Sequence, residues 1–455
     1  MILNKFKTQN RAKILPNSGL FHFDISSNGD RTRVHLRVDP DGSGLLIINA
    51  SRIIHLNPTA LFMAYLFLQN TKHEQAINII IKTFDVPKAF AEIDYTQTSK
   101  QLQELIKPDG VCPIHDLNLD VTPPFSTTPS APYRMDMALT YRCNNDCAHC
   151  YNARSREFPE LSTKDWLWIL DLLWEIGVPH IVFTGGEPTL RSDLPDLISH
   201  AENNGQITGI NTNGRRLSDR KYLDTLVDAG LDHVQITIES HNPAIHDGMV
   251  KSLGAWAQTA AGIRNVLESS LYFMTNTTML TNNSPVLRET LEFLANLGVP
   301  IIGLNALIYS GRGLSVDTGI AENELHSLLT IAREITSFHG QRLIWYTPTQ
   351  YCNFDPVQLE LGIKSCSAAR YNMCIEPNGD VIPCQSYYFS LGNILKLPWA
   401  SIWDHELSKN LRGRVDIPRK CTDCALVSEC RGGCPLALPV MTDNKRIGDS
   451  NAKPA

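Results

Sequence analysis

The sequence predicts an α/β protein: a partial TIM-like barrel of six β/α units, with an N-terminal winged-helix domain and a C-terminal cysteine-rich domain. Apolar strands alternate with amphipathic helices in the middle of the chain, which is typical of parallel sheets. The first hundred residues combine a hairpin with short helices, and the alternation ends near Gln341. The predicted parts are a winged helix at 1–110, a linker at 111–131, the barrel at 132–340, the cysteine-rich domain at 341–440 and a tail at 441–455.

Composition and charge exclude several classes of protein. The net charge of −6 argues against a nucleic acid as the main partner, because nucleic-acid domains usually carry a basic face. The N-terminus lacks the apolar segment of a secretory signal, and no run of about 18 apolar residues predicts a membrane span. We therefore expect a cytoplasmic protein. In a reducing compartment, clustered cysteines favour metal ligation or catalysis over disulfides.

The N-terminal zone predicts a small sheet followed by helices. Two apolar segments form a hairpin around the Asp41-Gly42 turn, and a third strand follows. Asn57 is placed to cap a helix that has Pro58 at its first position. The three strands are "TRVHLRV" (32–38), "LLIINA" (45–50) and "RIIHL" (52–56), and the three helices are 57–70, 73–84 and 99–106. Three strands with three helices give the shape of a winged helix.

The Pro-, Ser- and Thr-rich stretch 120–132 reads as an extended linker before the barrel. Six apolar strands follow at intervals that leave room for one helix each. They are 135–140, 180–186, 207–214, 233–240, 271–280 and 301–309. In such folds the chemistry is at the C-terminal ends of the strands.

Three cysteines follow directly on the first of these strands, in "TYRCNNDCAHCYN". Cys143, Cys147 and Cys150 have the spacing C-x3-C-x2-C. Three is an odd number for disulfides, and a structural zinc site prefers four ligands. A four-iron cluster held by three thiolates keeps one iron open, as catalytic sites do. The residues alone leave an incomplete zinc site or redox thiols as alternatives.

The cysteine loop, with "TGGEP" (184–188) one β/α unit later, resembles the radical S-adenosylmethionine (radical SAM) superfamily over roughly 132–335. The resemblance implies that Cys143, Cys147 and Cys150 hold a [4Fe-4S] cluster whose open iron binds S-adenosylmethionine. Electron transfer then yields a 5′-deoxyadenosyl radical, which takes a hydrogen atom from the substrate. The cofactor contacts that the resemblance implies are His149, Gly185, Gly186, Glu187, Asn213, Thr237, Glu239, Asn276 and Arg312.

These contacts differ in how directly the motifs support them. His149 would place its ring near the adenine, and the GGE motif ending in Glu187 would receive the methionyl amino group. Thr237 and Glu239 stand where relatives often carry Ser and Asp near the ribose. Asn213 in an Asn-Gly pair could equally serve a turn, and Arg312 could be an ordinary surface residue.

A second cysteine cluster begins at Cys366 and ends at Cys434. Its last four cysteines, taken alone, could bind zinc. The whole pattern resembles the SPASM extension of radical SAM peptide maturases, which holds auxiliary iron–sulfur clusters. The resemblance implies that Cys366, Cys374, Cys384 and Cys434 bind one auxiliary cluster and that Cys421, Cys424 and Cys430 supply three ligands to another. No cysteine follows Cys434, so the last ligand would be Asp443, Asp449 or an open position.

Two cysteines belong to neither cluster. Cys112 has no visible partner, and we expect it to be structural. Cys352 is either an inert thiol or a loop residue near the active site.

Residues 32–107 resemble the RiPP recognition element, a winged helix like the pyrroloquinoline-quinone peptide chaperone. The resemblance implies that the leader of a precursor peptide adds a strand to the sheet edge, at Arg33–Val38 or Arg52–Leu56. The alternative is a winged helix that only packs or dimerises. DNA binding fits the acidic balance less well.

We therefore expect a radical SAM enzyme that modifies a ribosomally synthesised peptide by forming a thioether, a carbon–carbon crosslink or an oxidised residue. Its partners would be the precursor peptide and an electron donor such as flavodoxin or ferredoxin, with no nucleic acid and no membrane. One alternative is a related enzyme acting on a tetrapyrrole. Another is a zinc-stabilised binding or regulatory protein.

Overall fold

The computed structural model describes residues 16–27, 30–49, 52–106, 129–152, 154–415 and 417–438. The chain divides into two compact units, Met1–Ala131 with Leu173–Pro179 and Pro132–Leu172 with His180–Ala455. No helix in the described ranges has both the length and the apolar character needed to span a membrane. The predictions for Cys112, Asp443, Asp449 and most of the linker fall outside the described residues.

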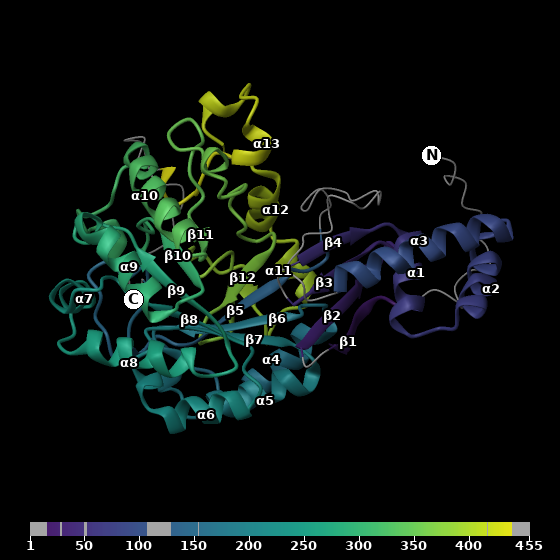
Figure 1. The fold of residues 1–455 in the computed structure, drawn as a ribbon, viewed down its shortest axis with the longest axis horizontal. Helices are drawn as coiled ribbons and strands as arrows, with labels where there is room; N and C mark the ends of the chain where they lie inside the picture. The colour runs from purple at the N-terminus through teal and green to yellow at the C-terminus, as the bar shows by residue number, and fades with distance from the viewer. Residues whose placement is uncertain are drawn as a thin grey trace. The chain divides into compact units, whose positions relative to one another are not determined.

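The first unit contains the predicted sheet and helices, with one strand more than expected. Its antiparallel strands pair in chain order, followed by three helices (Figure 1). They are β1 (Gly19–Ser27), β2 (Asp30–Val38), β3 (Gly44–Ile48), β4 (Arg52–Leu56), α1 (Pro58–Leu68), α2 (His73–Phe84) and α3 (Lys88–Ile106). The capping prediction is confirmed, because Asn57 Oδ1 accepts a hydrogen bond from the Ala60 N–H at 2.9 Å.

The extra strand changes which edge a peptide could use. The segment Arg33–Val38 lies within β2, which pairs with β1 on one side and β3 on the other. That candidate edge is therefore wrong, because both sides of β2 are already hydrogen-bonded. The second candidate, Arg52–Leu56, is β4, and it is an edge strand of the sheet among the described residues.

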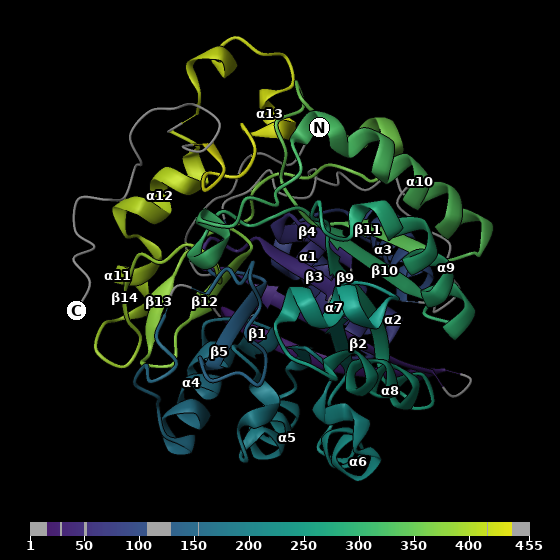
Figure 2. The same ribbon diagram turned by 90° about the vertical axis from the view of Figure 1, so that its left-hand side faces the viewer.

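The second unit confirms the six-stranded parallel barrel. The strands are β5 (Arg134–Thr140), β6 (His180–Gly185), β7 (Ile207–Thr212), β8 (His233–Thr237), β9 (Tyr272–Thr278) and β10 (Ile301–Asn305). Helices alternate with these strands along the chain; most lie around the outside of the strands, and one, α7, lies in front of the strand ends in Figure 2. They are α4 (Thr163–Glu175), α5 (Leu194–Asn204), α6 (Arg220–Asp228), α7 (Pro243–Val250), α8 (Ala255–Leu267), α9 (Leu287–Leu297) and α10 (Leu325–Phe338).

The same sheet continues into the C-terminal zone at both edges. β11 (Arg342–Trp345) adds parallel to β10, and β12 (Asn372–Ile375) adds parallel to β5. β13 (Asp380–Ile382) and β14 (Gly392–Asn393) extend the β12 side in antiparallel fashion. The rest of the zone consists of loops, 3-10 turns and short helices α11 (Trp399–Trp403), α12 (Glu406–Gly413) and α13 (Val427–Cys430). The functional boundary at residue 340 stays a prediction.

A buried ion pair fastens this zone to the barrel. Glu376 directly follows β12 and is fully buried. Its carboxylate accepts hydrogen bonds from Arg154 Nε at 2.7 Å and Nη2 at 3.1 Å, and from the Tyr141 hydroxyl at 3.2 Å. A two-pronged guanidinium–carboxylate pair fixes direction as well as distance. The start of the C-terminal zone is thus held against the segment that surrounds the cysteine loop.

Candidate active site

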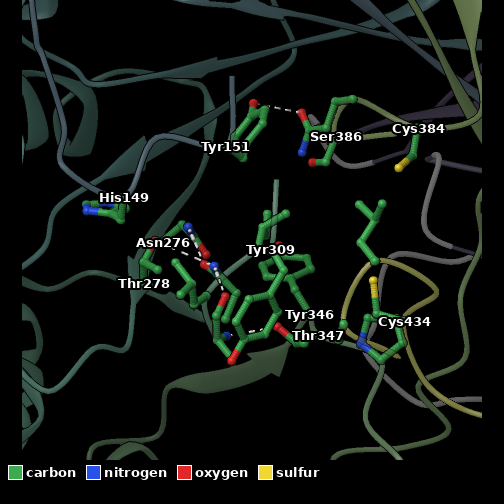
Figure 3. A pocket seen from close by; sticks show the side chains of 18 of the residues that line it. His149, Tyr151, Asn276, Thr278, Tyr309, Tyr346, Thr347, Cys384, Ser386 and Cys434 are labelled. Atoms are coloured by element: carbon green, nitrogen blue, oxygen red, sulfur yellow. Dashed lines mark hydrogen bonds between the residues drawn. The ribbon is translucent and has the colours of Figure 1, made fainter. Parts of the chain in front are cut away.

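A cavity of about 960 Å³ opens at the C-terminal ends of the barrel strands. It lies within the second unit, and its lining includes cysteines from both sequence clusters. These are Cys143, Cys147, Cys150, Cys366, Cys384 and Cys434. In Figure 3, Cys384 and Cys434 stand on one side of the cavity, and His149, Asn276 and Thr278 stand on the other.

The cysteine loop, Cys143 to Cys150, is held by backbone hydrogen bonds. The Asn145 N–H points at Cys143 Sγ at 3.4 Å. The N–H groups of Asp146 and Ala148 donate to the last carbonyls of α7, at 2.9 and 3.0 Å. A loop fixed at its backbone presents its thiols in a set direction, as a preorganised ligand site requires.

Arg312 also supports this loop, but it does not line the cavity. Its backbone N–H donates to the Cys150 carbonyl at 2.9 Å, and its guanidinium donates to the carbonyls of Asp146 and Cys147, both at 3.0 Å. A further bond joins it to Asp146 Oδ1 at 2.6 Å. The structure therefore places Arg312 as a brace on the loop, and a contact of Arg312 with the cofactor stays a prediction.

Gly185 and Gly186 line the cavity where β6 ends. A Cβ atom at Gly185 would lie 2.1 Å from the Thr140 carbonyl oxygen, and one at Gly186 would lie 2.3 Å from that of Arg142. The Gly186 N–H donates to the Thr140 carbonyl at 2.7 Å. Glycine is thus required here by the close approach of two strand ends, in addition to any approach of a ligand.

Glu187 does not reach the cavity. Its carboxylate is fully buried and accepts hydrogen bonds from the Thr189 N–H at 3.1 Å and from the hydroxyls of Thr189 and Thr212 at 2.7 Å each. The Asn213 N–H completes the set at 2.8 Å. Burial raises the pKa of Glu187, and these hydrogen bonds partly offset that effect. The carboxylate joins the ends of β6 and β7, which contrasts with the direct ligand contact expected from the sequence.

Four other expected contacts, Asn213, Thr237, Glu239 and Asn276, do line the cavity. Asn213 Nδ2 donates to Asn144 Oδ1 in the cysteine loop at 2.6 Å. Asn276 Nδ2 donates to Asn305 Oδ1 at 2.8 Å, and Asn276 Oδ1 is buried without a hydrogen-bond partner. A hydrogen-bond donor on a ligand in the cavity would satisfy this buried carbonyl oxygen.

His149 is almost entirely buried, and its Nε2 lies 3.0 Å from Glu239 Oε1. Burial acts to lower the pKa of His149, but the charge and hydrogen bond of Glu239 outweigh it and raise that pKa. The second oxygen of Glu239 accepts from the Thr278 N–H at 2.9 Å. His149 Nδ1 is buried without a partner. The sequence therefore located both residues correctly at the cavity, but it did not reveal that they pair.

Burial and neighbouring charges disfavour the thiolate form of Cys147 in the cysteine loop. Burial raises the pKa of Cys147 well above its usual value, and the charges of Cys150 and Glu239 add to the effect. A bound cation removes such a penalty, because metal coordination deprotonates thiols outright. The donor set therefore fits a metal centre better than it fits free thiolates.

Three of the four cysteines predicted for one auxiliary cluster reach the cavity. Burial, with the charge of Cys366, raises the pKa of Cys434 to about 12. The fourth, Cys374, is buried on β12 among Ala138, Tyr141 and Ile382 and does not line the cavity. The remaining cysteines, Cys421, Cys424 and Cys430, also lie off the cavity, near α13.

No three Cys, His, Asp or Glu side chains in the described part of the chain already converge on a point where one metal ion would fit. A four-iron cluster does not need such convergence, since each of its thiolates binds a different iron.

The sequence missed several residues of the site. Arg215, two residues beyond Asn213, donates to Asn145 Oδ1 at 2.8 Å and to Ser252 Oγ at 2.9 Å, and also bonds the Asn144 carbonyl. Its place just after "NTNG" was the available signal. Tyr309 and Tyr346 lie between the strand ends and the C-terminal cysteines (Figure 3). Tyr346 follows β11, a strand that the sequence did not reveal.

Two family models match this chain. The model described as the radical SAM superfamily matches residues 137–294. A second, described as the SPASM iron-sulfur cluster-binding domain, matches residues 366–425. The two matches cover the cysteine loop and most of the second cysteine cluster.

Curated relatives and solved structures were also found. A PqqA peptide cyclase from Streptomyces rochei is 30% identical over 318 residues, which is 67% of this chain and 84% of the relative. An AdoMet-dependent heme synthase from Oleidesulfovibrio alaskensis is 27% identical over 316 residues, covering 65% and 80%. The crystal structure of Streptococcus suis SuiB bound to the precursor peptide SuiA is similar with a TM-score of 0.67 at 17% identity, covering 89% of this chain and 94% of that one. The matched 89% of this chain is more than residues 132–455 alone could supply.

Proposed function

This chain belongs to the radical SAM superfamily and is a radical SAM enzyme with a SPASM extension, and we propose that it modifies a ribosomally synthesised precursor peptide. The observation that carries the proposal is a cavity that is lined by cysteines of both clusters. Its volume of about 960 Å³ is at the upper end for ligand pockets. That space suits a cosubstrate together with a segment of a second, larger molecule.

The cysteine loop fits the cofactor that the family uses. Cys143, Cys147 and Cys150 would hold a [4Fe-4S] cluster. When this cluster and S-adenosylmethionine are bound, they supply the reductive chemistry that gives a 5′-deoxyadenosyl radical. The protein's part is to hold the thiols in place. Arg312 and the last carbonyls of α7 do this through hydrogen bonds to the backbone of the cysteine loop.

The remaining cavity wall would orient the cosubstrate and exclude water. Gly185 and Gly186 offer their backbone at the end of β6, and the unsatisfied Asn276 Oδ1 offers an acceptor. His149 and Glu239 form a buried pair beside the cysteine loop. Closed, preorganised polar groups of this kind suppress side reactions of a reactive intermediate. A peptide segment would then occupy the space beside Tyr309 and Tyr346.

Cys366, Cys374, Cys384 and Cys434 would bind the first auxiliary cluster, and Cys421, Cys424 and Cys430 would contribute to the second. The described geometry supports the first set in part, because three of its members face one cavity and Cys374 lies on the adjoining strand. These clusters would position the peptide or accept the electron released when a new bond forms. Flavodoxin or ferredoxin would supply the reducing electron.

The leader of the precursor would bind the first unit. β4 is an edge strand among the described residues, and its Arg52 and Ile53 are only partly buried. An edge strand offers unpaired backbone groups on which an extended peptide can add a strand. Relatives support a peptide as substrate: one is named a PqqA peptide cyclase, and SuiB was solved with its precursor peptide.

The first experiment tests the radical chemistry. The wild-type protein, reconstituted with iron and sulfide without oxygen, should form 5′-deoxyadenosine from S-adenosylmethionine when it is reduced. The variant C143A/C147A/C150A should form none. If the variant still forms 5′-deoxyadenosine, the cluster assignment is wrong.

The second experiment distinguishes a peptide substrate from a tetrapyrrole substrate. The similarity to a heme synthase makes a tetrapyrrole the second candidate. Deletion of residues 1–110 should abolish binding of the precursor, measured by fluorescence anisotropy of a labelled peptide. Formation of 5′-deoxyadenosine without peptide serves as the control that the barrel remains folded. Unchanged peptide binding in the deletion variant, or turnover of a porphyrin by both forms, would favour the tetrapyrrole enzyme.

A further inference from the structure

Cys352, which stands outside both sequence clusters, lies beside the C-terminal trio of Cys421, Cys424 and Cys430. It does not line the active-site cavity, so a direct role there is not supported. The trio alone would leave one corner of a four-iron cluster without a protein ligand, and no cysteine follows Cys434 in the sequence. The position of Cys352 in the fold suggests where the missing ligand comes from.

The backbone before Cys352 packs directly on the end of the second cysteine cluster. The Tyr351 N–H donates to Cys430 Sγ at 3.3 Å, and Cys430 Sγ donates to the Thr349 carbonyl at 3.6 Å. The Cys434 N–H donates to the Pro348 carbonyl at 3.2 Å. Gly433 fits closely here, since a Cβ on it would lie 3.2 Å from the Gln350 backbone nitrogen. These contacts fix the main chain of Cys352 next to Cys430.

A second contact joins Cys352 to the other end of the trio. Lys420 Nζ lies 3.5 Å from Cys352 Sγ, and Lys420 immediately precedes Cys421. The side chain of Cys352 therefore lies near the residue that begins the trio, while the residue before it contacts Cys430. N–H···S and ammonium contacts of this kind are typical around cluster ligands.

We propose that Cys352 is the fourth ligand of the second auxiliary cluster and completes a four-cysteine set with the trio. The inference rests on the proposed function, which assigns that cluster to the C-terminal zone. It replaces Asp443, Asp449 and the open position as the candidates for this ligand. Thiolate is the usual ligand of a cubane, and four of them leave no iron free for a substrate. The second auxiliary cluster would then transfer electrons or stabilise the fold, without binding the peptide itself.

Chemical protection in the intact protein tests this without any substitution. The reconstituted full-length chain is treated with iodoacetamide under nitrogen, before and after iron is removed with a chelator, and alkylated cysteines are identified by mass spectrometry. Cys352 and Cys424 are both exposed, so they form a matched pair. Both should be protected in the iron-loaded chain and react together once iron is removed.

Two outcomes overturn the proposal and can be told apart. If Cys424 is protected while Cys352 reacts equally fast before and after chelation, the cluster exists and Cys352 does not bind it. If neither cysteine is protected and the trio is alkylated at once, the second auxiliary cluster itself is absent. The proposed function would then be wrong in assigning a second auxiliary cluster to the C-terminal zone.

Cysteine variants give an independent measure. In the background C143A/C147A/C150A, the change C352A should lower iron by about one to four atoms per chain, through a three-iron cluster or complete loss. The matched control C112A removes the other cysteine outside the two clusters and should leave iron and sulfide unchanged. Unchanged iron, sulfide and electron-spin signals in C352A would overturn the proposal, as would iron loss confined to D443N or D449N.

Discussion

His149 Nε2 lies 3.0 Å from Glu239 Oε1, so a residue of the cysteine loop is paired with a residue just beyond β8. The same carboxylate accepts a hydrogen bond from the N–H of Thr278, the last residue of β9. One buried side chain therefore sets the distance between the loop and two strand ends. The pair can be tested through both stability and binding.

Replacing Glu239 by alanine should leave two buried donors unpaired, at His149 and Thr278. We expect a loss of about 2–6 kcal/mol in the free energy of unfolding and weaker binding of S-adenosylmethionine, because each orphaned donor costs about 1–3 kcal/mol. Denaturant unfolding and equilibrium dialysis measure the two effects. E239Q keeps an acceptor oxygen and should lose less than half as much; equal losses in both variants would contradict this account.

Glu187 should behave as a structural acid, because all four of its partners are donors. E187Q places amide hydrogens against one of these donors and should cost about 1–3 kcal/mol in the free energy of unfolding. T212V removes one donor to Glu187 and also leaves the Gly214 N–H without its acceptor, so it should cost about 1–3 kcal/mol. Urea unfolding of the two variants gives the comparison. A stability of E187Q equal to wild type, combined with lost cosubstrate binding, would instead point to direct ligand contact.

Arg312 should govern how long the cysteine loop retains its metal. R312A removes three hydrogen bonds from the loop, and R312K keeps the charge but not the planar fork. We expect iron release to a chelator to be fastest in R312A and intermediate in R312K. The loss of visible absorbance over time measures this release. R333A changes a surface arginine paired with Glu360 and should release iron like wild type. Identical release in R312A and R333A would rule the brace out.

A histidine pair within the barrel should make stability fall with acid. His180 Nε2 and His233 Nε2 lie 2.7 Å apart, and burial, helped by the charge of Arg134, lowers the pKa of His233 to about 4. The unfolded chain binds this proton near pH 6.5, so the neutral form stabilises the fold fully above pH 6.5. This stabilisation is lost as pH falls from 6.5 toward 4.

The measurement compares thermal unfolding of wild type and H233Q at pH 7.5 and 5.5. Wild type should lose roughly 1 kcal/mol more per pH unit below 6.5 than the variant, which has no proton to gain. Above pH 7 the difference between the two proteins should be constant. Parallel curves over the whole range would show that His233 is not the titrating group.

The sequence predicted the barrel because each of its six strands is long and apolar enough to give a local signal. It did not predict β1, although Phe21, Phe23 and Ile25 alternate and pack on the core of the first unit. It also missed β11 and β12, which have only four residues each. Strands so short carry no usable period, and their pairing partners are distant in sequence.

In the candidate site, too, the sequence predicted what local motifs encode and missed what depends on distant parts of the chain. Spacing of like residues located the cysteines, His149 and the glycines, because those motifs are compact. Whether a side chain faces the cavity or the wall behind it depends on the neighbouring strand, so the sequence could not show that Glu187 and Arg312 lie off the cavity lining. Cys352 had no partner in its own stretch of sequence, and only the fold brings it to Cys430.

The attachment of β12 to β5 has a consequence for how the chain is made. Tyr141 and Glu376, which join beside these strands, are 235 residues apart. During synthesis, the outer edge of β5 therefore stays unpaired until almost the whole polypeptide has left the ribosome. Long-range pairing of this kind folds slowly, and an open strand edge invites association with other nascent chains. Production of soluble protein should thus depend on chaperones that cover this edge until β12 pairs with it.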